Sequence, residues 1–340
     1  MKHIFVSLAV LWATSPAWGA DSQIELRWSE RLNDGAVHRT ITQHTVNAVA
    51  AAQPQYVSAP SQSVDTPIAL HSQSVLVFDQ ESGAPLLAKN AQMQTPIASI
   101  TKLMTAMLVL DASLNMDESI VISPADRDTL KGTSSRLTMG SIYTRGQLLH
   151  LALIASDNRA AHALARTYPG GMNRFVEMMN RKAQQLGMTH TVYVEPTGLN
   201  QANRSTATDL ARMANHAYQN YPEIREISSS GQYTMGTKRV VLKKRNRKSQ
   251  VFYRTVAFNN TNRLTRENSW QIGLSKTGFI NEAGHCLVMQ ARVAHKNVII
   301  VLLDAVGTYN RVGDAARIKR WLESLPAGRL GQARSDAAKS

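Results

Sequence analysis

The chain has 340 residues, 43% of them hydrophobic, a formal net charge of +14 and a single cysteine. The composition supports a globular body, and one cysteine excludes a disulfide framework within the chain, so an ordinary core must stabilise the fold. No apolar run reaches the roughly 20 residues of a spanning helix, and a basic exported protein meets anionic polymers or lipid headgroups before nucleic acid. We expect at most peripheral membrane contact.

The chain begins with the pattern of a secretory signal peptide. Met1–His3 is a positive start, Ile4–Trp12 is an apolar run, and small residues follow over Ala17–Ala20. This order is typical of exported proteins. We place cleavage after Gly19, while cleavage after Ala17 or Ala20 stays open. The mature protein, expected in the periplasm, then carries a net charge of +13, because Lys2 is removed (14 − 1).

Composition divides the remaining chain into three parts. Residues 20–67 are rich in Ala, Gln, Ser, Thr and Val without sustained periodicity, which predicts a disordered arm or linker. One catalytic domain is expected over 68–325, with a helical subdomain at about 112–225. A flexible tail is expected over 326–340.

Five β-strands are predicted from β-branched and apolar runs bounded by turn residues. Two lie early, at 74–78 and 85–88, and three lie late, at 271–276, 286–293 and 298–303. Helical periodicity dominates 97–221, and a last helix is expected at 312–325. The prediction is an α+β fold: an antiparallel five-stranded sheet from both chain ends packs against helices and leaves a cleft for a site.

Basic residues cluster over 238–248, around the apolar run Val240–Leu242. The pattern predicts a hairpin with a basic tip. Two interpretations stay open: a turn kept soluble by its charge, or a surface that steers the protein toward an acidic polymer.

The first candidate catalytic motif is Ser99–Ile100–Thr101–Lys102, at the start of an apolar helix predicted over 99–110. The i to i+3 spacing puts the Lys102 amine beside the Ser99 hydroxyl. Burial and a second nearby cation would both lower the pKa of Lys102, which lets it act as base for a Ser99 nucleophile. The alternative is that Ser99 caps the helix and Lys102 extends its amine to solvent.

Two further motifs follow along the chain. Ser156–Asp157–Asn158 lies in a loop between two predicted helices, where these residue types also serve as helix caps. Lys276–Thr277–Gly278 continues a predicted strand, and its glycine leaves room for a substrate at the strand edge. Each motif is weak alone. Their joint order of helix start, interhelical loop and strand is typical of β-lactamases and penicillin-binding proteins.

Beyond these motifs, the chain resembles low-molecular-mass penicillin-binding proteins, and within them D-alanyl-D-alanine endopeptidases of the penicillin-binding protein 7 type. The resemblance covers about residues 70–325, in stretches at 96–106, 158–161, 168–171, 195–199, 276–279 and 283–289. It implies the penicillin-binding and β-lactamase-like transpeptidase fold. It also implies hydrolysis of peptidoglycan cross-links between D-alanine and diaminopimelate. The arm before residue 67 and the basic cluster depart from the family pattern, and the cluster bears on substrate access.

The resemblance implies catalytic roles for four residues. Ser99 is the expected nucleophile, and Lys102 is the base that takes its proton. Ser156 is expected to relay a proton to the leaving amine, and Asn158 to hydrogen-bond the substrate amide and Lys102. Asp157 is expected to orient the loop.

The resemblance also implies how the substrate is held. Lys276 and Thr277 are expected to bind its carboxylate side, with Gly278 beside it on the strand. The backbone N–H groups of Ser99 and Phe279 are the expected oxyanion hole. Water would resolve the acyl-enzyme, and β-lactams would acylate Ser99 as substrate mimics.

Three alternatives are weighed against the endopeptidase. The run Glu195–Asn200 resembles the E-x-x-L-N loop of class A β-lactamases, but it has one extra residue, so a structural turn is the better interpretation. A D-alanyl-D-alanine carboxypeptidase is nearer, although the usual ones carry a further β domain and an amphipathic C-terminal anchor, whereas a short Gly-, Ala- and Ser-rich tail follows Leu325. A catalytically idle wall-binding module would not need Ser99, Lys102 and Lys276 together.

The sequence gives little support for metal-dependent or cysteine-based catalysis. The histidines show no ligand spacing, so we expect no metal and no cofactor. Cys286 lies in an apolar strand and is expected to be a core residue. The sequence does not predict the oligomeric state.

Overall fold

The computed structural model describes residues 30–32, 35–37, 67–242 and 250–325. Two compact units divide the chain, Met1–Gln53 and Pro54–Ser340. The first contains an antiparallel pair, β1 (Glu30–Leu32) and β2 (Gly35–Val37). The predicted signal peptide, most of the predicted arm and the predicted tail lie outside the described residues.

The second unit contains the predicted five-stranded antiparallel sheet. Its order is β11-β12-β13-β3-β4, so a strand from the end of the chain, β13, pairs with the first, β3. The strands are β3 (Ser72–Asp79), β4 (Pro85–Lys89), β11 (Gln271–Ile280), β12 (Gly284–Val293) and β13 (Lys296–Ala305). All five predicted strands are confirmed, and the sheet does draw on both chain ends.

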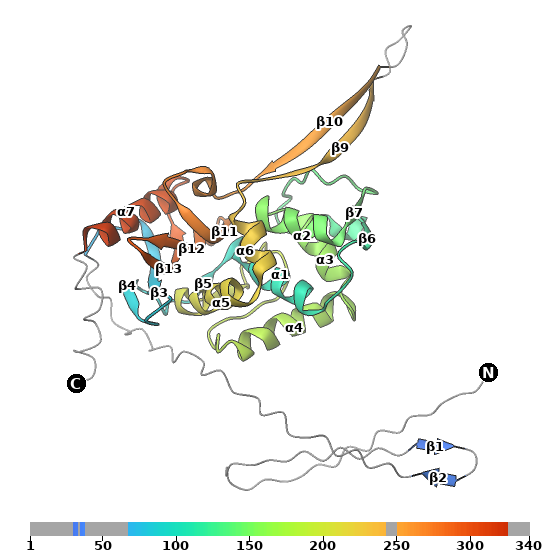
Figure 1. Cartoon of the computed structure of the whole chain (residues 1–340), viewed down its shortest axis with the longest axis horizontal. Helices are drawn as coiled ribbons and strands as arrows, with labels where there is room; N and C mark the ends of the chain where they lie inside the picture. Colours follow the sequence, from blue (N-terminus) through green and yellow to red (C-terminus); the bar gives the residue numbers. More distant parts are fainter. Residues whose placement is uncertain (1–29, 33–34, 38–66, 243–249, 326–340) are drawn as a thin grey trace. The chain divides into compact units, whose positions relative to one another are not determined.

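Both faces of the sheet are buried, which explains why its strands read as nearly continuous apolar runs. Leu76 and Val301 face the larger core, which contains the helices of the middle region. Val77 and Ile300 face the other way, against α7 (Asn310–Ser324). Burial of each such side chain stabilises the fold by roughly 1.5–3 kcal/mol. Figure 1 shows α7 on one side of the sheet and the other helices on the opposite side.

Asp314 fastens α7 to the first strand of the sheet. Its buried carboxylate accepts hydrogen bonds from the Ser72 backbone N–H at 2.7 Å, the Ser72 hydroxyl at 2.6 Å and the His71 N–H at 3.0 Å. Arg317 pairs with the same carboxylate at 2.6 Å. These hydrogen bonds and the Arg317 ion pair lower the pKa of Asp314 against the opposing effect of its burial.

Helices fill the region between the two groups of strands. They are α1 (Thr101–Asp111), α2 (Arg145–Ile154), α3 (Asn158–Arg166), α4 (Gly171–Gln185), α5 (Ala207–Asn220) and α6 (Pro222–Ser229). Every residue of α1 from Thr101 to Val109 is buried, which confirms the prediction of a buried helix. No described helix is both long enough and apolar enough to cross a membrane.

Short elements that the sequence analysis did not predict position the loops. They are β5 (Thr95–Pro96) with β8 (Arg204–Ser205), β6 (Ser119–Val121) with β7 (Ile142–Thr144), and the 3₁₀ turns η1 (Ala98–Ile100), η2 (Pro124–Asp126) and η3 (Arg263–Arg266). Two to four residues are too few to show a hydrophobic period, so pattern reasoning cannot find them. The β5–β8 pair leads directly into η1.

The predicted hairpin is confirmed as an antiparallel ribbon of β9 (Gln232–Leu242) and β10 (Gln250–Asn259). Its pairing runs from Gln232 with Asn259 to Leu242 with Gln250, with a bulge between Thr255 and Val256. Of the predicted basic cluster 238–248, residues 238–242 belong to β9 and residues 243–248 lie outside the described part of the chain.

Candidate active site

Ser99 lies in the η1 turn, immediately before the buried helix α1. The prediction placed Ser99 in the first turn of the helix, whereas α1 begins at Thr101 and Ser99 occupies a tighter 3₁₀ turn. The Thr101 hydroxyl donates to the Ala98 carbonyl at 2.8 Å, which closes this turn. Ala98 has φ of +46°, an uncommon conformation for a residue with a Cβ, so the backbone at Ser99 is locally strained.

Lys102 follows on the same helix face and is fully buried. Its Nζ lies 2.8 Å from Ser99 Oγ, 2.7 Å from Asn158 Oδ1 and 2.6 Å from the Thr197 carbonyl oxygen. The alternative that Lys102 reaches solvent is therefore wrong. Ser99 makes no side-chain cap for η1 or α1, so the capping alternative is wrong as well.

The three contacts of Lys102 suit a neutral amine. Two of its neighbours, Asn158 Oδ1 and the Thr197 carbonyl, are pure acceptors and take the two N–H groups of an NH₂. Lys102 Nζ also donates to Ser99 Oγ, and once that proton is lost the nitrogen lone pair faces the Ser99 hydroxyl. Burial lowers the pKa of Lys102 to about 8, although the carboxylates of Glu195 and Asp157 partly oppose this effect. The site thus places the Ser99 hydroxyl against an amine that is partly deprotonated near neutral pH.

Ser156 and Asp157 form the loop between α2 and α3, as predicted. Ser156 has φ of +56°, and its hydroxyl accepts a hydrogen bond from Lys276 Nζ at 2.8 Å. Asp157 is the N-cap of α3 and accepts from the Ala160 N–H at 3.1 Å. Its other oxygen accepts from the Ser135 hydroxyl at 2.7 Å. Within this motif, Asp157 therefore caps α3, while the Ser156 side chain contacts Lys276.

Asn158 connects the base to a loop that the sequence analysis missed. While Oδ1 faces Lys102, Nδ2 donates to Thr133 Oγ1 at 2.9 Å. Thr133 is held by Asp128, whose Oδ2 accepts from its N–H at 2.8 Å and its hydroxyl at 2.6 Å. From the same loop, Lys131 pairs with Glu282 in the β11–β12 turn at 2.5 Å. No motif marks this loop, so only the folded chain shows its role in holding Asn158.

Strand β11 brings Lys276 and Thr277 to the other side of the site. Lys276 is buried, and its amine contacts Ser156 Oγ and the Thr277 carbonyl, both at 2.8 Å. The Thr277 hydroxyl contacts that of Thr261 at 2.6 Å. Burial lowers the pKa of Lys276 well below its usual range, and the neighbouring Lys102 and Arg311 lower it further.

Gly278 allows β11 to lie directly against the turn that carries Ser99. A Cβ at this position would lie 2.9 Å from the Ile97 carbonyl oxygen and 3.1 Å from the Ser99 nitrogen. Only a residue without a side chain fits this approach. The next residue, Phe279, is half exposed and stacks on His285 at 4.3 Å between ring centroids. The backbone nitrogens proposed for the oxyanion hole therefore belong to two segments in close contact.

Arg311, in the first turn of α7, is a second residue that the sequence analysis missed. Its Nη1 donates to the Gly278 carbonyl oxygen at 2.9 Å, so a guanidinium lies behind the strand. Burial lowers the pKa of Arg311. Together with Lys102 and Lys276 it makes three basic groups close together, which favours an anionic ligand. No motif surrounds Arg311, and only the packing of α7 against the sheet places it here.

Glu195 lies in a structural turn, as predicted. Its carboxylate accepts from the backbone N–H groups of Thr197 at 2.7 Å and Gly198 at 2.6 Å, and from Asn203 Nδ2 at 3.0 Å. The loop in turn offers the Thr197 carbonyl to Lys102. Gly198, with φ of +86°, has no room for a Cβ, which would lie 1.9 Å from the Ala98 carbonyl oxygen. The loop supports the Ser99 turn from behind.

Neither Cys286 nor a metal cluster adds to this chemistry in the described residues. Cys286 is buried, and burial raises the pKa of its thiol to about 11. Over residues 67–242 and 250–325, no group of three or more His, Cys, Asp or Glu side chains is arranged to hold a metal ion.

Known proteins are similar to this chain in sequence and in fold. The sequence profile described as D-alanyl-D-alanine carboxypeptidase matches residues 60–307. The chain is 45% identical to the D-alanyl-D-alanine endopeptidase of Pseudomonas aeruginosa, across 82% of this chain and 84% of that protein. It is 38% identical to the enzyme of the same name from Escherichia coli, across 86% and 88% of the two chains.

Its fold is similar to that of penicillin-binding protein D2 from Listeria monocytogenes, solved in its ampicillin-bound form. The TM-score is 0.62 at 28% identity, and the match covers 76% of this chain and 99% of that one. The predicted penicillin-binding fold is thereby confirmed. The chain belongs to the D-alanyl-D-alanine carboxypeptidase family of serine peptidases, within the low-molecular-mass penicillin-binding proteins.

Proposed function

We propose that the protein is a D,D-endopeptidase that hydrolyses peptidoglycan cross-links at the bond between D-alanine and diaminopimelate. The observation that carries the proposal is the 2.8 Å contact between Ser99 Oγ and the buried amine of Lys102. Two relatives that this chain matches over more than four fifths of its length are named D-alanyl-D-alanine endopeptidases. The substrate is the cross-linked wall polymer.

Acylation follows from the positions of the two motifs on the helical side. Lys102 takes the proton of the Ser99 hydroxyl as Oγ attacks the D-alanyl carbonyl carbon. The carbonyl oxygen becomes an oxyanion between the N–H groups of Ser99 and Phe279, each worth about 3 kcal/mol. The proton passes from Lys102 through Ser156 to the leaving nitrogen as the C–N bond breaks. Asn158 holds both the Lys102 amine and the substrate amide.

Deacylation returns the serine to its starting state. A water molecule attacks the ester carbon of the acyl-enzyme, and Lys102 takes one of its protons. The ester C–O bond then breaks, Ser99 Oγ regains a proton from Lys102, and the product leaves with a D-alanine carboxylate.

Of the three basic groups, Lys276 and Arg311 would attract the carboxylate next to the leaving amine, because Lys102 must be neutral to act as the base. Lys276 and Thr277 lie on β11, and Arg311 reinforces their positive field from behind the strand. An anion at this point offsets the mutual repulsion that lowers the pKa of Lys276. We infer that β-lactams, whose carboxylate and amide imitate the substrate, acylate Ser99. The ampicillin complex of the Listeria relative supports this inference.

A carboxypeptidase that removes terminal D-alanine is the second candidate, because the family profile carries that description. The same acylation chemistry serves both reactions, which differ only in the leaving group. A class A-like β-lactamase has less support, because the Glu195 carboxylate is occupied by the hydrogen bonds of its own loop.

We also propose that the protein works in the periplasm after export. The signal-peptide pattern of residues 1–19 supports this location. The proposed substrate, peptidoglycan, also lies outside the inner membrane.

One experiment separates the two peptidase candidates. The protein without residues 1–19 is incubated with purified cross-linked dimers and uncross-linked pentapeptide muropeptides, and the products are weighed by mass spectrometry. We expect monomers from dimers, and the Ser99→Ala variant should yield none. Release of terminal D-alanine alone would overturn the endopeptidase proposal in favour of the carboxypeptidase.

A further inference from the structure

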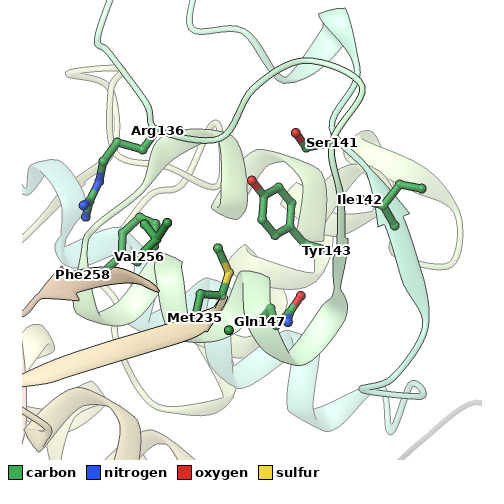
Figure 2. A pocket seen from close by; sticks show the side chains of 9 residues that line it. Arg136, Ser141, Ile142, Tyr143, Gln147, Met235, Val256 and Phe258 are labelled. Carbon is green, nitrogen blue, oxygen red and sulfur yellow. The ribbon is translucent and has the colours of Figure 1, made fainter. Parts of the chain in front are cut away.

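A cavity of about 470 Å³ lies beside the catalytic site, outside the three motifs. One wall is the loop around Arg136 with β7 and the start of α2, which contribute Tyr143 and Gln147. The other wall is the base of the β9–β10 ribbon, which contributes Met235 and Phe258. Figure 2 shows Arg136 beside Phe258 on one side of Met235, with Tyr143 and Gln147 on the other side of it.

The lining combines an apolar floor with one fixed cation. The Arg136 guanidinium lies 3.7 Å from the centroid of the Phe258 ring, and its Nη1 donates to the Ala257 carbonyl at 2.9 Å. In the described part of the chain these are the only contacts found for this exposed guanidinium, so its other N–H groups remain for a ligand. A guanidinium held flat in this way is arranged to bind a carboxylate with two hydrogen bonds.

Both walls continue into the catalytic site. From Phe258 the chain runs three residues to Thr261, whose hydroxyl contacts that of Thr277 at 2.6 Å. The Thr261 N–H also donates to the Ile154 carbonyl, at the end of the helix that precedes Ser156. On the opposite wall, Ser135, next to Arg136, donates to Asp157 at 2.7 Å. The cavity therefore adjoins the Ser156 and Thr277 side, toward which the leaving amine departs.

We propose that this cavity binds the second peptide stem of the cross-link, the strand that carries the leaving amine. The inference rests on the proposed endopeptidase function and adds its leaving-strand subsite. The three residue steps between Phe258 and Thr261, whose hydroxyl contacts that of Thr277, span at most about 10 Å. A single D-alanine spans about a third of that upper bound, whereas a peptide stem covers all of it. Carboxylates along the stem complement Arg136, and its aliphatic parts suit Tyr143 and Met235.

Arg136→Gln is the first test, with Arg181→Gln on α4 as the matched control. We expect Arg136→Gln to lower kcat/KM on cross-linked dimers by roughly tenfold to a hundredfold, the effect of losing a charge-assisted hydrogen bond, mainly through KM. Acylation by a fluorescent penicillin, which has no second stem, should stay within about twofold. Arg181→Gln, whose side chain is half exposed, should change neither rate.

A pair of opposite charges at Met235 separates charge from packing. Met235→Glu and Met235→Lys place side chains of similar length in the cavity and share any cost of folding. We expect the glutamate to lower kcat/KM on dimers well below the lysine variant, since the stem is anionic. Equal effects of the two substitutions would contradict an anionic occupant.

Several results would overturn the subsite. Unchanged dimer cleavage in Arg136→Gln is one, and an equal loss of penicillin acylation is another, because it would mean that Arg136 only holds the loop beside Asp157. Competition by peptide-free glycan chains would assign the cavity to sugar instead.

A binding measurement on an inactive variant tests the subsite without depending on catalytic turnover. Calorimetry with the Ser99→Ala protein and a free diaminopimelate-containing tetrapeptide stem should give binding that Arg136→Gln removes. If the wild-type protein cuts no dimer but the stem still binds through Arg136, the endopeptidase proposal fails and the subsite stands. If no stem binds, the subsite fails.

Discussion

At the scale of single residues, the buried Lys102 is the proposed base. Lys102 has no exposed surface, so the loss of hydration destabilises its charged form. The neutral form is the one that can act as a general base. The lowering of its pKa from 10.5 to about 8 corresponds to roughly 3 kcal/mol of preference. A neutral Lys102 amine can accept the proton of the Ser99 hydroxyl, which makes Ser99 Oγ a stronger nucleophile.

The pH dependence of acylation follows from this residue. Below a pH of about 8, Lys102 is mostly protonated and cannot accept the Ser99 proton, so the rate of acylation should fall about tenfold per pH unit. Above it the rate should level off. Stopped-flow labelling with a fluorescent penicillin from pH 5.5 to 9.5 measures this profile.

Lys102→Ala is the companion variant for that profile. It should acylate about 10²- to 10⁴-fold more slowly and without the inflection near pH 8, while its thermal unfolding shows a folded protein. A wild-type rate that is flat from pH 6 to 9 would contradict the assignment of Lys102 as base.

At the scale of elements, the close approach of β11 to the η1 turn forms the site. The turn, the α2–α3 loop and the strand are far apart in sequence, and each has a local reason for its shape: the Thr101 hydroxyl, the Asp157 cap and Gly278. Gly278 decides how near the strand comes to Ser99.

Gly278→Ala tests that approach. Its Cβ would meet the Ile97 carbonyl at 2.9 Å and push the strand away from Ser99 by a fraction of an ångström. We expect penicillin acylation to fall by about 10²-fold, because small displacements of reacting groups cost that much. Gly313→Ala in α7, where a Cβ meets nothing closer than 3.5 Å, is the control and should leave acylation unchanged. A Gly278→Ala rate equal to wild type would show that the close approach is dispensable.

The sequence predicted the long elements and singled out three motifs that the fold brings into contact. The strands of the sheet, the buried helix after Ser99 and the loop at Ser156 follow from periodicity and turn residues. The loop at Thr133 and the side chain of Arg311 could not be predicted, since tertiary packing alone brings them to Asn158 and Gly278. The η1 turn escaped because a single turn of 3₁₀ helix has the same composition as the start of an α-helix.

At the scale of the whole catalytic unit, β13 pairs with β3 to join the two chain ends in one sheet, and the last helix, α7, is connected to β3. Asp314 makes that connection through His71 and Ser72, some 240 positions away. Its ionised carboxylate accepts hydrogen bonds from two backbone N–H groups. The carboxylate therefore stabilises the sheet without touching the site.

Asp314→Asn should lower the free energy of unfolding by about 2–4 kcal/mol, because charge-assisted hydrogen bonds in a buried position are lost. The melting temperature should fall by roughly 5–12 °C, while the acylation rate per folded molecule stays the same. Calorimetry and penicillin labelling measure the two quantities, and Asp117→Asn at an exposed position is the control.

The pH dependence of stability belongs to the same residue. Because the pKa of Asp314 is lowered in the folded state, its contribution is complete above the unfolded value of about 3.8 and is lost as the pH falls through the lower folded value. In the Asp314→Asn variant this part of the acid destabilisation should be missing.

The most direct test of the whole account is the mass of the protein after reaction with a β-lactam, followed by mapping of the modified peptide. The account predicts one adduct per molecule, carried by Ser99, absent in Ser99→Ala and slow to form in Lys102→Ala. An adduct that persists in Ser99→Ala, or one that maps to Ser156, would contradict it.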